Sequence, residues 1–258
     1  MSRLAATVFL SSCLVFLTST SDAQQVLRRG FKTEEQRKGI VEQHNQLRNY
    51  VASGGVPTQP QAQNMREMRW DEELAQQAQR WADRCVFEHD PNLVNRKNER
   101  VGQNLAIFRT NVKAKLDSPD FQNLIYGWFN EVFKFGYNGT FSFDSGHYSQ
   151  MIWGKTYKIG CGYTGYSHKN LYNNYLVCNY YPAGNVQNSP PYEYGPHNCA
   201  ENELFTSWRY SSLCTIDKQL INACSANWKS RSAQQDDSAQ TTGTTGFETT
   251  MTESTVSS

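Results

Sequence analysis

Apolar positions recur at helical spacing in two segments of the first third of the chain. In residues 33–53, Thr33 followed by Gln36 has the pattern of a capping box, which predicts a helix start. The apolar face of this helix comprises Ile40, His44, Leu47 and Val51. After a loop over residues 54–68 that is rich in glycine and proline, a second helix is expected to begin near Asp71. Its apolar stripe comprises Leu74, Ala75, Ala78, Trp81, Ala82 and Cys85.

The middle of the chain carries a weaker pattern. Residues 90–117 are mostly polar and are hard to assign to a helix or a strand. Ser118 followed by Pro119 has the pattern of an N-cap with proline at the first helical position, so a third helix is predicted to start there. Its inward side chains are Phe121, Leu124, Trp128 and Val132, with Glu131 near its end. Residues 133–145 are predicted to form a loop rich in aromatic side chains.

Two later segments are typical of β-strands. Residues 157–163 and 174–181 are rich in Tyr, Val, Ile and Cys. Asn173-Asn174, with polar neighbours, predicts the turn between them. The chain therefore combines helices with a small amount of sheet.

Composition and the two ends of the chain narrow the class of protein. The formal net charge of +1 argues against a nucleic-acid binder, which usually carries a strong basic excess. Residues 1–23 have the positive start, short apolar run and small-residue cleavage site of a signal peptide, so the protein is predicted to be secreted and extracellular. A membrane anchor is the alternative, but a span takes about 20 apolar residues and no segment is that long. Residues 230–258 are mostly Ser, Thr, Gln and Gly, and are predicted to be disordered.

The cysteine count agrees with secretion. Of the 7 cysteines, Cys13 lies in the predicted signal peptide. The others are Cys85, Cys161, Cys178, Cys199, Cys214 and Cys224. An even number in a secreted chain predicts disulfides, and the absence of a C-x-x-C pair weakens the zinc-cluster alternative. Six cysteines allow about 15 pairings, and their spacing does not choose among them.

Five ordered motifs within residues 35–200 resemble the signatures of the CAP superfamily. They are Trp70-Asp71 through Cys85 to Glu88-His89-Asp90, Gly102-Gln103-Asn104-Leu105-Ala106, Gly146-His147-Tyr148 through Trp153, Ile159-Gly160-Cys161-Gly162, and Tyr175 through Asn185. This family comprises cysteine-rich secretory proteins, antigen 5 venom allergens and plant pathogenesis-related-1 proteins. The resemblance, closest to the antigen 5 type, implies an α+β fold, a three-layer α-β-α sandwich with a small antiparallel sheet. It also implies a Cys161–Cys178 disulfide and leaves the pairing of the other four cysteines open. We expect a CAP domain over residues 24–188 and a short Cys-bearing, hinge-like extension over 189–229.

The resemblance also implies a central cleft. Its residues are His89, Gln103, Glu131 and His147. Two neutral imidazoles are good ligands for Zn²⁺ or another divalent cation, so we expect His89 and His147 to bind such an ion weakly. Many relatives have glutamate where this chain has Gln103, and an amide is no general base near neutral pH. We therefore expect no enzymatic activity. The alternative is a metal-dependent hydrolase or protease in which Glu131 activates water.

An aromatic segment is a second candidate binding region. Its members are Trp128, Phe133, Phe135, Phe141 and Phe143. The first three have the loose spacing of caveolin-binding motifs, and the corresponding loop of relatives is implicated in sterol binding. The alternative is that these rings are core. Asn138-Gly139-Thr140 is a glycosylation sequon in the same loop. Ser149 lies two residues after His147 but has no identifiable Asp partner, so a structural hydrogen bond is favoured over a nucleophile.

Together these features predict a secreted, non-enzymatic binding protein. Its expected partners are a sterol or fatty acid, or a host or receptor protein, with no nucleic acid and no membrane span. A channel-modulating toxin is a further alternative, but the extension has far fewer cysteines than the channel-regulating region of cysteine-rich secretory proteins. A monomer is the default expectation.

Overall fold

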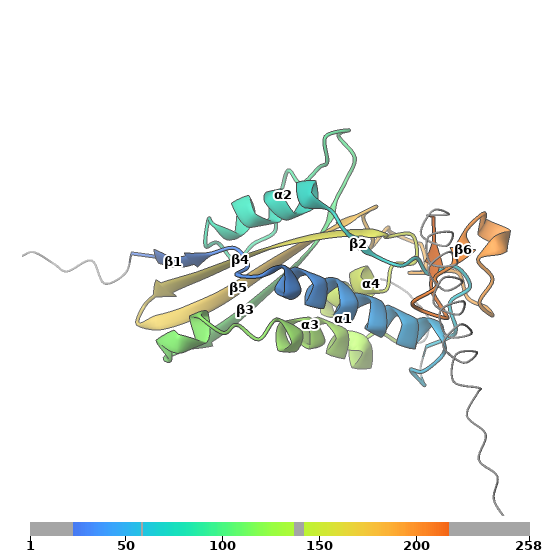
Figure 1. The fold of residues 1–258 in the computed structure, drawn as a ribbon, viewed down its shortest axis with the longest axis horizontal. Helices are drawn as coiled ribbons and strands as arrows, with labels where there is room; N and C mark the ends of the chain where they lie inside the picture. Colours follow the sequence, from blue (N-terminus) through green and yellow to red (C-terminus); the bar gives the residue numbers. More distant parts are fainter. Residues whose placement is uncertain (1–22, 58, 137–141, 217–258) are drawn as a thin grey trace, which may run out of the picture.

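The computed structural model describes residues 23–57, 59–136 and 142–216. A five-stranded sheet lies between two helical layers, with α2 on one face and α1 and α3 on the other (Figure 1). The α-helices are α1 (Glu34–Ala52), α2 (Glu72–Ala82), α3 (Phe121–Phe129) and α4 (Gly146–Met151). The 3₁₀ helices are η1 (Lys113–Leu116), η2 (Asn130–Lys134), η3 (Phe143–Ser145) and η4 (Ala200–Asn202). The predicted α-β-α sandwich is confirmed.

The first two helices begin as their sequences predict. Thr33 and Gln36 form a reciprocal capping box at the start of α1. The side chain of Asp71 accepts a hydrogen bond from the backbone of Leu74 at the start of α2. The predicted apolar faces of both helices are buried in the core.

The start of the third helix differs from the prediction. Helix α3 begins at Phe121, and its N-cap is Asp120 rather than Ser118, because the Asp120 carboxylate accepts from the backbone of Asn123 at 3.0 Å. Asp is as good an N-cap as Ser, and Asp120 directly precedes the apolar run that the core buries. The chain after the helix continues through η2, which contains Glu131.

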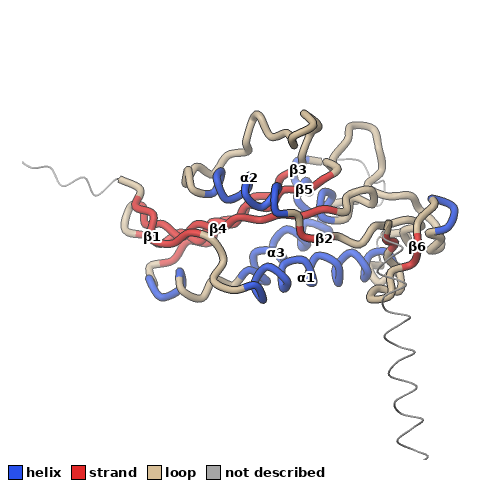
Figure 2. The backbone as a smooth tube through the Cα atoms, turned by 45° about the horizontal axis from the view of Figure 1, so that its top comes forward, coloured by secondary structure: helices blue, strands red, loops and turns tan. Residues whose placement is uncertain are grey.

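The strands follow the order β1-β4-β5-β3 (Figure 2). Their bounds are β1 (Gln25–Arg29), β2 (Arg69–Trp70), β3 (Gly102–Thr110), β4 (Lys158–His168), β5 (Leu171–Tyr181), β6 (Phe205–Thr206) and β7 (Cys214–Thr215). Pairing along the main order is antiparallel, while the short β2 runs parallel to β4 and β6 pairs with β7 in a separate ribbon. Strand β3 lies within the polar stretch 90–117, for which the sequence pattern predicts neither a helix nor a strand.

The turn of the β4–β5 hairpin also differs from the prediction. It falls at Lys169 and Asn170, whose φ angles of 48° and 62° are both positive. This is the backbone of a two-residue type I′ turn, which asparagine tolerates. Asn173 and Asn174 lie inside β5 instead, paired with Tyr166 and Gly165 of β4. The Asn174 side-chain oxygen accepts from the Tyr163 hydroxyl at 2.8 Å, which satisfies this oxygen within the core.

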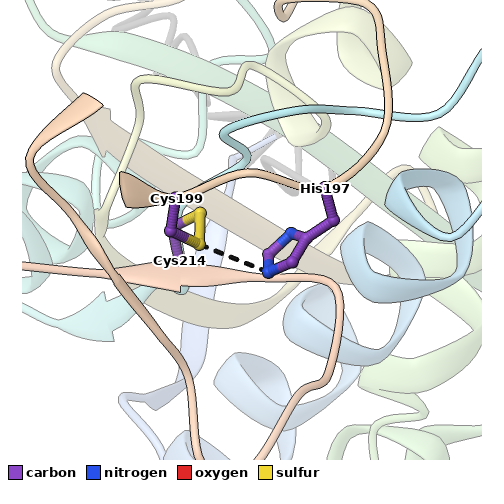
Figure 3. A group of neighbouring side chains, drawn as sticks. All are labelled: His197, Cys199 and Cys214. Carbon is purple, nitrogen blue, oxygen red and sulfur yellow. Dashed lines mark hydrogen bonds between the residues drawn. A yellow bond between two sulfur atoms is a disulfide. The ribbon is translucent and has the colours of Figure 1, made fainter. Parts of the chain in front are cut away.

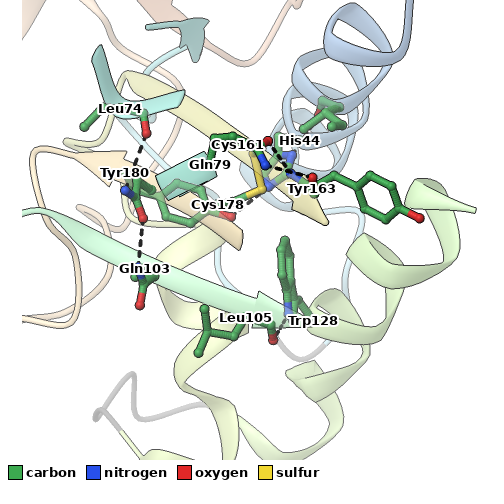
Figure 4. The surroundings of a disulfide bond; sticks show 12 residues. His44, Leu74, Gln79, Gln103, Leu105, Trp128, Cys161, Tyr163, Cys178 and Tyr180 are labelled. Atoms are coloured by element: carbon green, nitrogen blue, oxygen red, sulfur yellow. Dashed lines mark hydrogen bonds between the residues drawn. A yellow bond between two sulfur atoms is a disulfide. The ribbon is translucent and has the colours of Figure 1, made fainter. Parts of the chain in front are cut away.

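Successive side chains of the strands point to opposite faces of the sheet, so they contribute to two separate apolar clusters. Leu176, Cys178 and Tyr180 of β5 belong to the cluster that includes α1 and α3, whereas Tyr175 and Val177 belong to the α2 cluster. The Cys161–Cys178 disulfide joins directly opposed residues of β4 and β5, as the resemblance implied. Figure 4 shows it with side chains from both helical layers around it.

The extension after the main sheet packs onto the same core. Tyr192, Tyr210 and Leu213 belong to the α1–α3 cluster, and the backbone N–H of Cys214 donates to the Met65 carbonyl at 2.8 Å. A second disulfide joins Cys199 to Cys214.

Among the remaining cysteines, Cys85 is buried and belongs to no disulfide within the described residues. Cys224, residues 1–22 of the predicted signal peptide and the tail from residue 230 lie outside the described residues, as do the predictions made for them. Within the part of the chain described above, no helix combines the length and apolar character that crossing a bilayer requires.

Candidate functional site

Glu131 and His147 form a tightly hydrogen-bonded pair. The Glu131 carboxylate accepts from His147 Nδ1 at 2.6 Å, from the His147 backbone N–H at 3.0 Å and from the Tyr148 backbone N–H at 3.2 Å. Because a carboxylate only accepts, the hydrogen of the neutral imidazole resides on Nδ1, and Nε2 keeps its lone pair. The Trp128 ring stacks on the imidazole at a centroid distance of 6.1 Å, which further restricts its orientation.

His89 and Gln103 form a second pair of the same kind. The Gln103 amide nitrogen donates to Asn179 Oδ1 at 3.1 Å, while its oxygen accepts from the Asp90 backbone N–H at 3.1 Å. That oxygen lies 3.0 Å from Nδ1 of the exposed His89. The acceptor again assigns the hydrogen to Nδ1, so Nε2 of His89 is free to bind a metal ion. Figure 4 includes the side chain of Gln103, with a hydrogen bond, among the residues that surround the β4–β5 disulfide.

Strand β3 links the two pairs. Gln103 belongs to one pair, and the side chain of the next residue, Asn104, donates to the His147 carbonyl at 3.0 Å. Strand β3 is an edge strand of the sheet. The two pairs are therefore attached to the same end of this edge through neighbouring residues, Gln103 and Asn104.

A compact group of three side chains of metal-ligating type lies in the extension. His197, Cys199 and Cys214 each have a nitrogen or sulfur atom within 4.8 Å of those of the other two (Figure 3). Their two sulfurs form a disulfide, however, and metal binding by cysteine requires thiolates. His197 Nε2 lies 3.3 Å from Cys199 Sγ, and burial lowers the pKa of the imidazole. In the disulfide form this trio is a packed structural cluster. Sequence reasoning missed it, because nothing in the sequence indicates that His197 contacts a disulfide.

Ser149 has a structural role. Its segment is helical in α4, and its hydroxyl is within hydrogen-bonding distance of Asn185 Oδ1, at 2.6 Å, and of the Gly146 carbonyl. The buried hydroxyl is thus used in holding α4 against the chain after β5.

The aromatic candidates divide into two classes. Trp128 and Phe135 are buried, with Trp128 Nε1 donating to the Leu105 carbonyl at 3.0 Å. Phe133 and Phe143 are 88% and 93% exposed. Phe141 and Asn138 lie outside the described residues.

Comparison with known proteins identifies the family. The model of the cysteine-rich secretory protein family, CAP, matches residues 41–180, which include all four residues of the two pairs. The chain belongs to this family. A salivary antigen-5 of Triatoma infestans is 33% identical over 236 residues, covering 81% of this chain and 96% of that protein. Venom allergen 5.01 of Dolichovespula maculata is 44% identical over 171 residues, covering 62% and 73%.

Solved CAP structures agree with the fold. BmVAL-1 has a TM-score of 0.62 at 28% identity, covering 73% of this chain and 97% of that one. NaASP2, solved with Zn²⁺, has a TM-score of 0.53 at 30% identity, covering 70% and 96%.

Proposed function

We propose that this chain is a secreted, non-enzymatic CAP protein of the antigen 5 type that binds a divalent cation weakly. The ligands are Nε2 of His89 and Nε2 of His147. The observation that carries the proposal is that both imidazoles donate from Nδ1 to an oriented side-chain acceptor. Metal-binding histidines characteristically have such a partner, which sets the tautomer and the ring orientation.

The donor set fits a weak, open site. Imidazole nitrogen suits Zn²⁺ and neighbouring transition metals. His89 and His147 supply only two firm ligands, whereas a structural zinc site usually has four. Water would complete the coordination. A relative at 30% identity has been solved with Zn²⁺, which supports zinc as the first ion to test.

The hydrogen bonds of Glu131 and Gln103 support a binding role over catalysis. Both Glu131 oxygens already accept from His147 or Tyr148, so this carboxylate orients the imidazole and α4. Gln103 occupies the equivalent position beside His89 and cannot exchange a proton near neutral pH. A hydrolase would need one of these groups free to activate water.

Secretion is supported by three independent features. The relatives include salivary and venom proteins. Two disulfides are formed in the described residues, and disulfides are rare in reducing compartments. The first 23 residues have the pattern of a signal peptide.

Isothermal titration of the purified mature protein with Zn²⁺ tests the metal site. We expect saturable binding of about one ion per chain, lost in the His89→Ala/His147→Ala variant. Glu131→Gln should weaken binding by about 10- to 100-fold, because it changes the acceptor that orients His147. His168→Ala is the matched control, since His168 belongs to neither pair. Absence of saturable binding, or full binding by the double variant, would contradict the proposal.

Exposed Phe133 and Phe143 favour a second function, binding of a sterol or fatty acid. Nearly complete exposure of two large rings is costly in water and is a feature of interaction surfaces. A Phe133→Ser/Phe143→Ser variant should lose binding of cholesterol or palmitate while keeping its melting temperature. Truncation of buried Phe135 would instead lower stability, which separates ligand contact from core packing.

A further inference from the structure

A groove separate from the histidine pairs lies beside the C-terminal end of α4. Its volume is about 520 Å³, within the range of small-molecule sites, which runs from roughly 300 to 1,000 Å³. It is formed by the loop before β2, the loop after α4 and the segment after β5. None of His89, Gln103, Glu131 and His147 lines it.

Flat, rigid side chains make the apolar wall. Trp153 and Tyr192 line the groove although both are almost fully buried, and Pro190 adds a further ring. The Gly154 N–H donates to the Pro191 carbonyl at 2.6 Å, and the Tyr192 hydroxyl donates to the Pro60 carbonyl at 2.9 Å. These bonds hold the wall in place without a ligand. Flat walls of this kind favour a planar, aromatic body over a flexible chain.

Two cations stand at the groove. Arg66 and Lys155 line it together with one carboxylate, Glu193. Within the described residues neither Arg66 nor Lys155 has an ion-pair partner, and the Arg66 guanidinium lies 5.7 Å from the centroid of the Tyr157 ring. The lining therefore carries two cations against one carboxylate, and an anionic group is its electrostatic complement.

The loops that carry the two cations are fixed relative to one another. The Arg66 N–H donates to the Gly154 carbonyl at 3.0 Å. The buried Arg48 guanidinium donates to the carbonyls of Arg66 and Gly154, the residue before Lys155. Both cations are therefore presented from backbone that is already ordered, which lowers the entropic cost of binding.

We propose that this groove binds a small aromatic molecule that carries one anionic group, a carboxylate or a sulfate. The ring lies against Trp153, Tyr192 and the partly exposed Val186. The anion pairs with Arg66 and Lys155. This site is independent of the divalent cation at the histidine pairs.

Paired fluorescent probes test both halves of this proposal on the full mature protein. The first probe is 8-anilinonaphthalene-1-sulfonate, and the second is N-phenyl-1-naphthylamine, which has the same rings without the sulfonate. We expect one sulfonate probe per chain and weaker binding of the neutral probe. Arg66→Gln/Lys155→Gln should weaken the sulfonate probe about tenfold and leave the neutral probe unchanged, because two partly exposed charge contacts are lost. Arg66→Lys, which keeps both positive charges, should retain most of the preference for the sulfonate probe over the neutral probe.

Further variants locate the site. Val186→Asp should weaken both probes, because it places a carboxylate against the apolar wall. Lys113→Gln, a surface lysine outside the groove, and His89→Ala/His147→Ala should leave both unchanged. The proposal is overturned if the sulfonate probe does not bind, if the two probes bind equally, or if binding is lost in Phe133→Ser/Phe143→Ser instead. Melting temperatures of all variants check that each protein is folded.

Discussion

Arg48 is fully buried, and its guanidinium binds backbone carbonyls rather than a carboxylate. It donates to the carbonyl of Met151 at the end of α4 and to those of Trp153 and Thr156 in the loop that follows. It also donates to the carbonyl of Arg66 before β2. Burial lowers the pKa of Arg48 to about 9, so the group is still charged at neutral pH. This one side chain therefore donates hydrogen bonds to backbone carbonyls that are not paired within a helix or a strand.

Arg48→Met should therefore be strongly destabilising although Met has a similar apolar length. Several buried carbonyls would lose a donor, so we expect the free energy of unfolding to fall by about 4 kcal/mol. Urea unfolding monitored by tryptophan fluorescence measures this. The control is Arg209→Met, which removes an exposed ion pair with Glu42 and should cost no more than about 1 kcal/mol. Equal losses in the two variants would show that the carbonyl contacts of Arg48 contribute little.

His44 should make stability depend on pH. Its Nδ1 lies 2.7 Å from the Ile40 carbonyl and its Nε2 3.0 Å from the Tyr180 hydroxyl, and burial lowers the pKa of the imidazole from 6.5 to about 4. Between these values the unfolded chain binds a proton that the folded chain does not. The contribution of neutral His44 is therefore complete above pH 6.5 and lost as the pH falls toward 4, by about 3 kcal/mol in total.

Urea unfolding of the wild type and of His44→Gln, at intervals between pH 4 and pH 6.5 and above, measures how the stability contribution of His44 changes with pH. The variant should be less stable at neutral pH, and the difference between the two proteins should shrink on acidification. A difference that is constant with pH would mean that His44 does not titrate as its burial requires.

At the scale of elements, the β4–β5 hairpin depends on a turn with two positive φ angles. Asn170, at φ 62°, tolerates this backbone, glycine does so at no steric cost, and a β-branched residue does not. Asn170→Gly should change the free energy of unfolding by less than about 1 kcal/mol, whereas Asn170→Val should lower it by about 1–2 kcal/mol. Chemical unfolding of both variants measures the contrast. Equal stability of the two would indicate that the turn adopts another conformation.

At the scale of the whole molecule, the extension shares its core with the sandwich. Tyr210 and Leu213 pack in the same cluster as α1, and the Cys199–Cys214 disulfide closes a separation of 15 residues. Cys199→Ser/Cys214→Ser should lower the free energy of unfolding by about 3 kcal/mol. Calorimetry should show a single transition at a lower temperature. Two separate transitions would mean that the extension unfolds independently.

Some features could be predicted from the sequence because their causes are local. The cap of α1 at Thr33, the cap of α2 at Asp71 and their apolar stripes depend on residues three or four positions apart. The four residues of the histidine pairs are found only through the family motifs, because His89 and His147 carry no local signal that relates them. The divalent ion stays a prediction until it is measured.

Only the tertiary structure decided the features that depend on distant partners. Strand β3 was missed because it forms against β5, and its polar residues hold the two histidine pairs rather than marking a loop. Asn173 and Asn174 were misplaced in a turn because their propensity favours turns, whereas pairing with β4 places them in a strand. The groove at Arg66 likewise requires segments far apart in sequence. The Cys199–Cys214 pairing could not be predicted, because the cysteine spacing does not choose among the possible pairs. The sequence by itself determined the family, the first two helices and the Cys161–Cys178 pairing that the family implies. Packing decided the rest, because hydrogen bonding and burial depend on proximity in space.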